Sequence, residues 1–456
     1  SVYGGFTHDG VADGSKVTGS DSTIGGSVYG GQGTTGASSN TVVLDNVKVS
    51  GEVRGGKTTS GDASGNKVSL SNKTTFTGDL YAGYTENGNA TGNEVSLYDV
   101  SAPGNVYASY TAKGQAGGNS DETPSKVTIT KSSVTGSVYG GYTASGTANY
   151  SSVAIIDSTL ENTGGDAVAS VYAGYTKSGE ASHNQVTVSG ATSSIQGSVY
   201  GGRTESGAAN YSSVTIIDST LKNSAANRLY GSSVYGGYAE NGEASHNQAT
   251  VSGTKASIQS DVYGGRGTLD SSYNIVTLSE GTHVGHSVVG GFSLKTPDAD
   301  SATSRNVLHN EVTVSGSSVE GVIYGGEIRE GRGTVQHNNV NLYNASAGSD
   351  VIGGISLLSP TGNVEDNHVN ISAGTVEGSV YGGAFEYSLA NDPGNSDIIN
   401  NTVSLSEGAV ISGSVFGGYS SGIGNAIGNE VTVSDTSQVD GDVYGGMAEG
   451  NNDSNP

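Results

Sequence analysis

The sequence predicts an all-β fold, a right-handed parallel β-helix (β-solenoid) of about sixteen coils with 25–35 residues per coil. A four-residue signature, Val-Tyr-Gly-Gly or a close relative, recurs sixteen times. Short alternating runs of β-branched residues lie between the signatures, and no segment shows the 3.6-residue apolar periodicity of an amphipathic helix. We expect residues 1–456 to form a single continuous solenoid, cut from a longer protein because Ser1 opens inside a repeat.

Each signature marks one strand per coil. The residue before the tyrosine position is aliphatic in all sixteen units, as at Val138, so we expect it to face the core. The next residue, as at Tyr139, should then face outward, which fits the tolerance of Arg54 at this position. The second positions are Tyr3, Tyr29, Arg54, Tyr81, Tyr107, Tyr139, Tyr172, Tyr200, Tyr235, Tyr263, Val289, Tyr324, Ile352, Tyr381, Phe416 and Tyr444.

The glycine pair that follows indicates close approach of the backbone. Alanine replaces the first glycine at Ala82, Ala108 and Ala173. Alanine rarely adopts a positive φ, so these replacements favour crowding as the reason for small residues at this site.

A second strand begins about fifteen residues later with Asn-x-Val-x-Val or a close relative. Its asparagine has the same parity as the inward valines, so we expect a ladder of stacked amides at a corner of the coil. Eleven units carry it, at Asn40, Asn66, Asn93, Asn184, Asn247, Asn274, Asn310, Asn338, Asn367, Asn401 and Asn429.

Composition excludes several classes of protein. Trp and Cys are absent, Gly supplies 75 residues and charged residues make up 14%, which predicts a thin core of small and β-branched side chains. The net charge of −24 without a basic cluster argues against a nucleic-acid partner. No apolar stretch is long enough for a membrane-spanning helix, so we expect no membrane insertion by these residues. The absence of Cys rules out disulfides and thiolate metal sites.

We find no clustered acids and bases that would predict catalysis, and we expect a protein without enzymatic activity or cofactors. Asp157 and Asp218 occupy matching Ile-Ile-Asp-Ser-Thr segments and are interpreted as turn residues. His283 and His286 form an isolated His-x-x-His on an expected turn, and because we expect no carboxylates beside the two rings, we predict no metal site. Four further histidines precede the ladder asparagine and should point outward, at His183, His246, His309 and His337.

The outward tyrosines form the candidate binding site. Tyrosine offers a large contact area with a polar tip, which suits a protein or glycan partner. The alternative is that the rings only stack and stabilise neighbouring coils. The candidate partner-binding column comprises Tyr81, Tyr107, Tyr139, Tyr172, Tyr200, Tyr235 and Tyr263.

Val-Tyr-Gly-Gly-Tyr-x-x-x-Gly-x-Ala followed by Asn-x-Val-Thr-Val-Ser-Gly resembles the repetitive passenger region of bacterial type V autotransporter adhesins, over essentially the whole chain. The resemblance implies a right-handed β-helix at the bacterial cell surface that binds a protein or glycan on host cells or other bacteria, with lateral self-association as a further expectation. Two alternatives stay open, a self-assembling extracellular filament or matrix protein and a polysaccharide-degrading β-helix.

Overall fold

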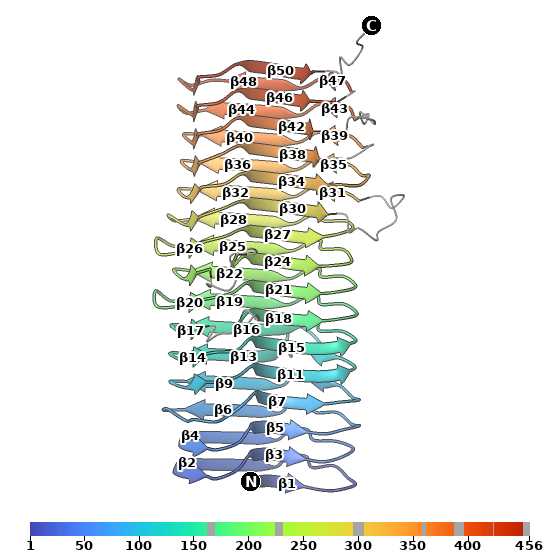
Figure 1. Cartoon of the computed structure of the whole chain (residues 1–456), viewed down its shortest axis with the longest axis vertical. Coiled ribbons are helices and arrows are strands. Elements are labelled where there is room, and N and C mark those ends of the chain that lie inside the picture. The colour runs from blue at the N-terminus through green and yellow to red at the C-terminus, as the bar shows by residue number, and fades with distance from the viewer. Residues whose placement is uncertain are drawn as a thin grey trace. The chain divides into compact units, whose positions relative to one another are not determined.

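The computed structural model describes residues 1–161, 169–223, 231–294, 305–357, 362–386, 396–422 and 424–449. Every regular element among these residues is a β-strand, and the strands pair in parallel. The chain divides into two compact units, Ser1–Ser233 and Val234–Pro456, and within each unit successive coils stack on one another (Figure 1). The all-β solenoid prediction is therefore confirmed. Helices able to cross a membrane are not found in the described ranges.

Each coil of the first unit contributes one strand to each of two large sheets, and most coils add a short third strand. The strands of the first sheet are β1 (Val2–Phe6), β3 (Val28–Gln32), β5 (Val53–Lys57), β7 (Leu80–Thr85), β11 (Val106–Lys113), β15 (Val138–Ser145), β18 (Val171–Thr176) and β21 (Val199–Thr204). Those of the second sheet are β2 (Lys16–Ile24), β4 (Thr41–Val49), β6 (Lys67–Ser71), β9 (Glu94–Tyr98), β13 (Ser125–Thr130), β16 (Ser151–Ile156), β19 (Gln185–Ser189) and β22 (Ser213–Ile217). The third sheet contains β10 (Ser101–Ala102), β14 (Ser133–Val134), β17 (Thr159–Leu160), β20 (Ser194–Ile195) and β23 (Thr220–Leu221), and a separate pair is β8 (Ala90–Thr91) with β12 (Ala116–Gly117).

The second unit repeats this plan and adds a fourth, short sheet. Its first-sheet strands are β24 (Val234–Ala239), β27 (Val262–Gly267), β30 (Val288–Leu294), β34 (Ile323–Arg329), β38 (Val351–Leu357), β42 (Val380–Glu386), β46 (Val415–Ser420) and β50 (Val443–Ala448). Its second-sheet strands are β25 (Gln248–Ser252), β28 (Ile275–Ser279), β32 (Glu311–Ser315), β36 (Asn339–Tyr343), β40 (His368–Ser372), β44 (Thr402–Ser406) and β48 (Glu430–Val433). The third sheet has β26 (Ser257–Ile258), β29 (His283–Val284), β33 (Ser318–Val319), β37 (Ser346–Ala347), β41 (Thr375–Val376), β45 (Val410–Ile411) and β49 (Gln438–Val439), and the fourth has β31 (Val307–Leu308), β35 (Val335–Gln336), β39 (Val364–Glu365), β43 (Ile398–Ile399) and β47 (Ala426–Ile427).

The core is a narrow column of aliphatic side chains drawn from all three sheets. In one coil of the first unit these are Val138, Val153, Ile155 and Leu160, each at most 1% exposed. Val138 pairs in register with the same residue type in both neighbouring coils, and Tyr139 does likewise on the opposite face of the strand. The inward position of the aliphatic stripe is therefore confirmed.

The asparagine ladder is also confirmed. In the second unit Asn338 Nδ2 donates to Asn367 Oδ1 at 2.9 Å, and Asn367 Nδ2 donates to Asn401 Oδ1 at 2.9 Å. Each Oδ1 also accepts the backbone N–H of the asparagine in the preceding coil, at 3.0 Å in both cases. The second Nδ2 proton of Asn367 goes to the Val335 carbonyl at 3.0 Å. The buried amides thus satisfy both one another and the backbone at the corner.

The ladder explains why the second glycine of each signature is small. A Cβ at Gly83 would lie 2.3 Å from Asn93 Nδ2. In the next coil Ser125 takes the place of asparagine, and the second glycine becomes Ser109. The Ser109 and Ser125 hydroxyls lie 2.6 Å apart, and Asn93 Nδ2 donates to Ser109 at 2.8 Å, so two serines fill the space of one asparagine and one glycine.

The first glycine is constrained by the neighbouring coil rather than by its φ angle. A Cβ at Gly55 would lie 2.5 Å from the Ala82 carbonyl oxygen. Neither glycine of a described signature has a positive φ. The expectation of crowding at this position is confirmed.

Candidate functional site

The outer face of the first sheet carries two columns of aromatic rings in the first unit. The first column is the predicted one, in which Tyr81 and Tyr107 stack with ring centroids 4.8 Å apart and Tyr107 and Tyr139 with centroids 4.7 Å apart. The stack continues through Tyr172 to Tyr200, with centroids 4.9 Å apart at each step. Because the coils repeat in register, the ring spacing follows the strand spacing of about 4.8 Å.

The second column lies three residues further along each strand. Tyr84 and Tyr110 stack at 4.9 Å, and Tyr110 and Tyr142 stack at 5.0 Å. The two columns meet edge to face, with 5.3 Å between the ring centroids of Tyr81 and Tyr84. Both arrangements are favourable geometries for aromatic pairs.

Stacking covers most of the surface of these outward tyrosines. Tyr81 and Tyr107 are each 8% exposed and Tyr172 is 7% exposed, although all three project from the outer face. Each ring face is covered by the ring of the next coil, so a sugar cannot stack on it. Burial raises the pKa of Tyr81 and Tyr107 well above the usual tyrosine value. Ring edges and hydroxyl tips are what remain for a partner.

In the second unit the predicted residues Tyr235 and Tyr263 stack with centroids 5.1 Å apart, and Tyr235 is 6% exposed. The column then changes character, because Val289 pairs with Tyr263, and Ile352 also stands at a ring position. The seven candidate residues are thus brought into column geometry as five in the first unit and two in the second. Their role in binding a partner stays a prediction.

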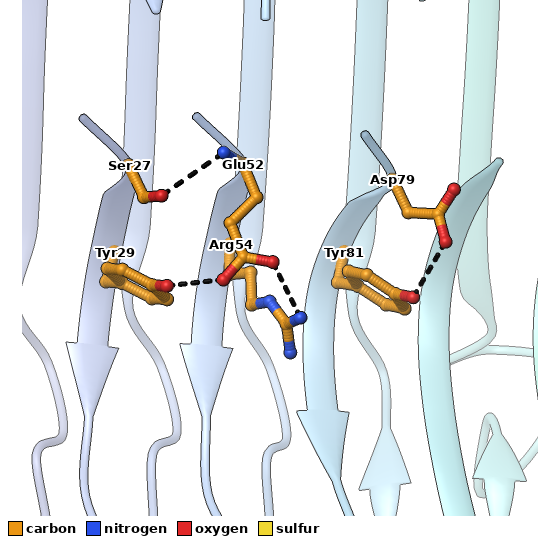
Figure 2. A network of polar contacts seen from close by, with 6 residues as sticks. All are labelled: Ser27, Tyr29, Glu52, Arg54, Asp79 and Tyr81. Atoms are coloured by element: carbon orange, nitrogen blue, oxygen red, sulfur yellow. Dashed lines mark hydrogen bonds and ion pairs between the residues drawn. The ribbon is translucent and has the colours of Figure 1, made fainter. Parts of the chain in front are cut away.

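Arg54 interrupts the first column near its beginning, between Tyr29 and Tyr81 (Figure 2). Its side chain is only 12% exposed, its Nη2 lies 2.7 Å from Glu52 Oε2, and its guanidinium carbon lies 4.6 Å from the Tyr81 ring centroid. The guanidinium therefore continues the stack as a cation–π contact. Arg54 therefore lies on the outer face, as predicted for this position, but its planar cation is paired and stacked rather than open to solvent.

The carboxylates beside this arginine hold the hydroxyl tips of the rings. The Tyr29 hydroxyl donates to Glu52, and the Tyr81 hydroxyl donates to Asp79 at 3.1 Å (Figure 2). Burial, followed by the hydrogen bond to Glu52, raises the pKa of Tyr29 to about 12. Although burial opposes it, the hydrogen bonds from Tyr29 and Arg54 lower the pKa of Glu52.

Two more arginines extend the second column. The guanidinium carbon of Arg203 lies 5.4 Å from the Tyr175 ring centroid. In the second unit that of Arg266 lies 5.4 Å from the centroid of Tyr238 and 5.2 Å from that of Phe292. Cations thus replace rings without breaking the columns.

A further stack of rings at the corner before the ladder asparagine was missed by the sequence reasoning. Tyr150 and His183 stack at 4.9 Å in the first unit, and in the second Tyr273 and His309 stack at 4.8 Å, as do His309 and His337. These residues have φ between 55° and 58°, the left-handed conformation. Desolvation, and then the neighbouring His337, lower the pKa of His309. The signal was present in the sequence, since tyrosine and histidine alternate at this position.

The remaining candidates are held by local contacts. Carboxylates do lie beside the His-x-x-His segment, contrary to expectation: His283 Nε2 is 3.4 Å from Glu320 Oε1, and His286 contacts Asp261. Within the described ranges no three His, Cys, Asp or Glu side chains are arranged to hold a metal ion. Asp157 has a φ of 48°, in keeping with its interpretation as a turn residue.

Turn, ladder and column positions repeat from coil to coil in the described parts of both units. No protein-family model matches the chain, and no curated protein has a similar sequence. The described residues form a regular scaffold with polar side chains at its corners and stacked aromatic rings on the outer face of the first sheet.

Proposed function

We propose that this chain forms the shaft of a bacterial cell-surface adhesin of the autotransporter passenger type. The shaft either projects a binding site away from the cell or itself mediates binding to host cells or other bacteria. The observation that carries the proposal is that every coil repeats an inward aliphatic residue, and most coils repeat the outward ring and the ladder asparagine. In such a fold each coil depends on its neighbours alone, so length grows by adding coils. A shaft requires this property, whereas a catalytic protein requires a unique local cluster.

Three sequence features support the proposal. Residues 139–201 and 200–265 are nearly copies of each other, as expected where length matters more than any one site. The chain has no cysteine, so its fold needs no disulfide. The net charge of −24 favours solubility and disfavours non-specific adsorption to anionic surfaces.

The tyrosine columns contain the partner surface that we predicted. Because their rings are stacked, a test of binding must separate the loss of the hydroxyl groups from the loss of the stack. Changing Tyr139, Tyr172, Tyr200 and Tyr235 to serine would remove the stacks and destabilise the coils. Changing the same four residues to phenylalanine keeps the stacks and removes only the hydroxyl tips. Unchanged binding by the phenylalanine variant, with a fold verified by circular dichroism, would exclude the hydroxyls as contacts.

The proposal itself is tested by adhesion of beads coated with the whole chain to epithelial cells and to bacterial cells. We expect saturable attachment that soluble protein competes away, and none for beads coated with an unrelated acidic protein. Failure to attach to any cell type would oppose an adhesive role for these residues. Long filaments of purified protein in electron micrographs would instead support a self-assembling structural protein.

A further inference from the structure

An open groove with a volume of about 510 Å³ lies at the corner between the second and third sheets of the first unit. Hydroxyl groups line it, because Ser101, Ser133 and Thr159 occupy the same position of successive third-sheet strands. Thr75 and Thr192 add hydroxyls at its two ends along the chain. This groove lies apart from the tyrosine columns of the first sheet.

Charged residues of alternating sign follow one another along the groove, one from the turn of each successive coil. They are Lys73, Asp99, Lys131 and Asp157, with φ angles of 63°, 53°, 50° and 48°. Backbone hydrogen bonds between coils fix these turns, for example from Lys73 N–H to the Asp99 carbonyl at 2.7 Å. With about 4.8 Å between coils, the two lysines stand roughly 10 Å apart along the stack.

Both ammonium groups are available to a ligand. In the described part of the chain neither Lys73 nor Lys131 forms an ion pair, and both residues are exposed. Lys131 Nζ lies 5.7 Å from the centroid of the Tyr98 ring. Tyr98 is 45% exposed, and its partners in the adjacent coils are Ser71 and Thr130, so its ring face is not covered by another ring.

We propose that this groove binds an extended acidic glycan in which a carboxylate-bearing sugar alternates with a neutral one. The carboxylates pair with Lys73 and Lys131, whose two-coil separation suits every second sugar of an extended chain. Hydroxyls of the intervening sugars donate to Asp99 and Asp157, as the Thr192 hydroxyl already does to Asp157 at 3.1 Å. Lys131 Nζ lies over the ring of Tyr98 beside the groove, a cation–π contact that positions the ammonium group without neutralising its charge.

The charge pattern also sets the specificity. Because a carboxylate stands between the lysines, a polyanion with a charge on every sugar would place negative groups against Asp99. The chain as a whole carries −24, which further disfavours dense polyanions such as heparin. Ion pairs at an exposed groove are screened by salt, so binding should weaken as ionic strength rises.

This inference deepens the adhesin proposal by naming a ligand class and a site for it. The test uses the whole chain and a hyaluronan decasaccharide, which alternates glucuronate with N-acetylglucosamine, in isothermal titration calorimetry. We expect measurable binding, with weaker binding of neutral chitin hexamer and of heparin. The double variant Lys73→Gln/Lys131→Gln should lose about tenfold or more in affinity, equivalent to one good charge-assisted contact.

The control variant is Lys113→Gln/Lys177→Gln, which changes the net charge equally at exposed residues of other strand ends. It should bind within about twofold of the parent, since only a screened long-range effect remains. A parent chain that does not bind hyaluronan, or a groove variant that binds as well as the control, would overturn the inference. The bead assay distinguishes the glycan proposal from the adhesin proposal. If coated beads attach to cells but the chain does not bind hyaluronan, only the glycan site is rejected. If the beads do not attach and the chain does not bind hyaluronan, the adhesin role is rejected as well.

Discussion

Replacing Asn367 with leucine tests the asparagine ladder at the centre of the second unit. The side chain is fully buried and takes part in four hydrogen bonds. Its Oδ1 accepts from the backbone N–H and Nδ2 of Asn338, and its Nδ2 donates to the Val335 carbonyl and to Asn401 Oδ1. Leucine is similar in size but supplies none of these partners.

The cost follows from which groups find another partner. Asn338 Nδ2 keeps its bond to the Val307 carbonyl at 2.9 Å, and Asn401 Oδ1 keeps the backbone N–H of residue 367 at 3.0 Å. The backbone N–H of Asn338 loses its acceptor. An orphaned buried donor costs about 1–3 kcal/mol and each other lost bond about 0.5–1.5 kcal/mol, so after some gain from apolar burial we expect about 3–5 kcal/mol of destabilisation.

Asn370→Leu is the matched control in the same coil, on the strand β40 that follows Asn367. Asn370 faces outward, is half-buried, and its Nδ2 donates to Asn341 Oδ1 at 3.0 Å. Losing this single solvated bond should cost below about 1 kcal/mol. Urea denaturation followed by circular dichroism measures the global effect, and hydrogen exchange over residues 335–343 measures the local one. If the two variants have equal free energies of unfolding in urea and equal hydrogen-exchange rates, the ladder is refuted as a source of stability.

Three further predictions follow from the core, the corner stack and the interrupted column. Val138→Asp places an unpaired charge in a fully buried site and should cost at least about 4 kcal/mol, whereas a melting curve like that of the parent would contradict the inward stripe. The lowered pKa of His309 means that the unfolded chain binds more protons than the folded one, so stability present above about pH 6.5 should fall as pH drops toward 5. His309→Tyr keeps a ring in the stack and should flatten that pH dependence of the melting temperature; an unchanged slope would exclude His309 as its source. Arg54→Met leaves Glu52 without its cation and should lower the free energy of unfolding by about 2 kcal/mol. Adding Glu52→Gln to this variant should recover part of the loss in thermal melts. If the effects of the two changes are strictly additive, the pair is uncoupled.

Much of the fold could be predicted because the repeat imposes it. A position that is aliphatic in every coil, as at Val138, can only face the core. An asparagine with the same parity, as at Asn367, is also buried, so its amide must form hydrogen bonds with the asparagine amides of neighbouring coils. Arg54 and Tyr107 could not be placed in this way. Alternation along a strand tells which face a side chain occupies, but not whether the residues above and below it cover that face.

The sequence by itself therefore determined the parallel solenoid, its inward stripe and its amide ladder, because these depend on periodicity and parity along one strand. The tertiary structure decided what lies between coils. It brought Arg54 between tyrosine rings, closed the faces of the tyrosine columns, and aligned Lys73, Asp99 and Lys131 along one groove. Such contacts join residues some 26 to 32 positions apart, and their register depends on the length of each intervening turn. Coil lengths differ from one repeat to the next, so the neighbour of each surface residue follows only once the coils are stacked.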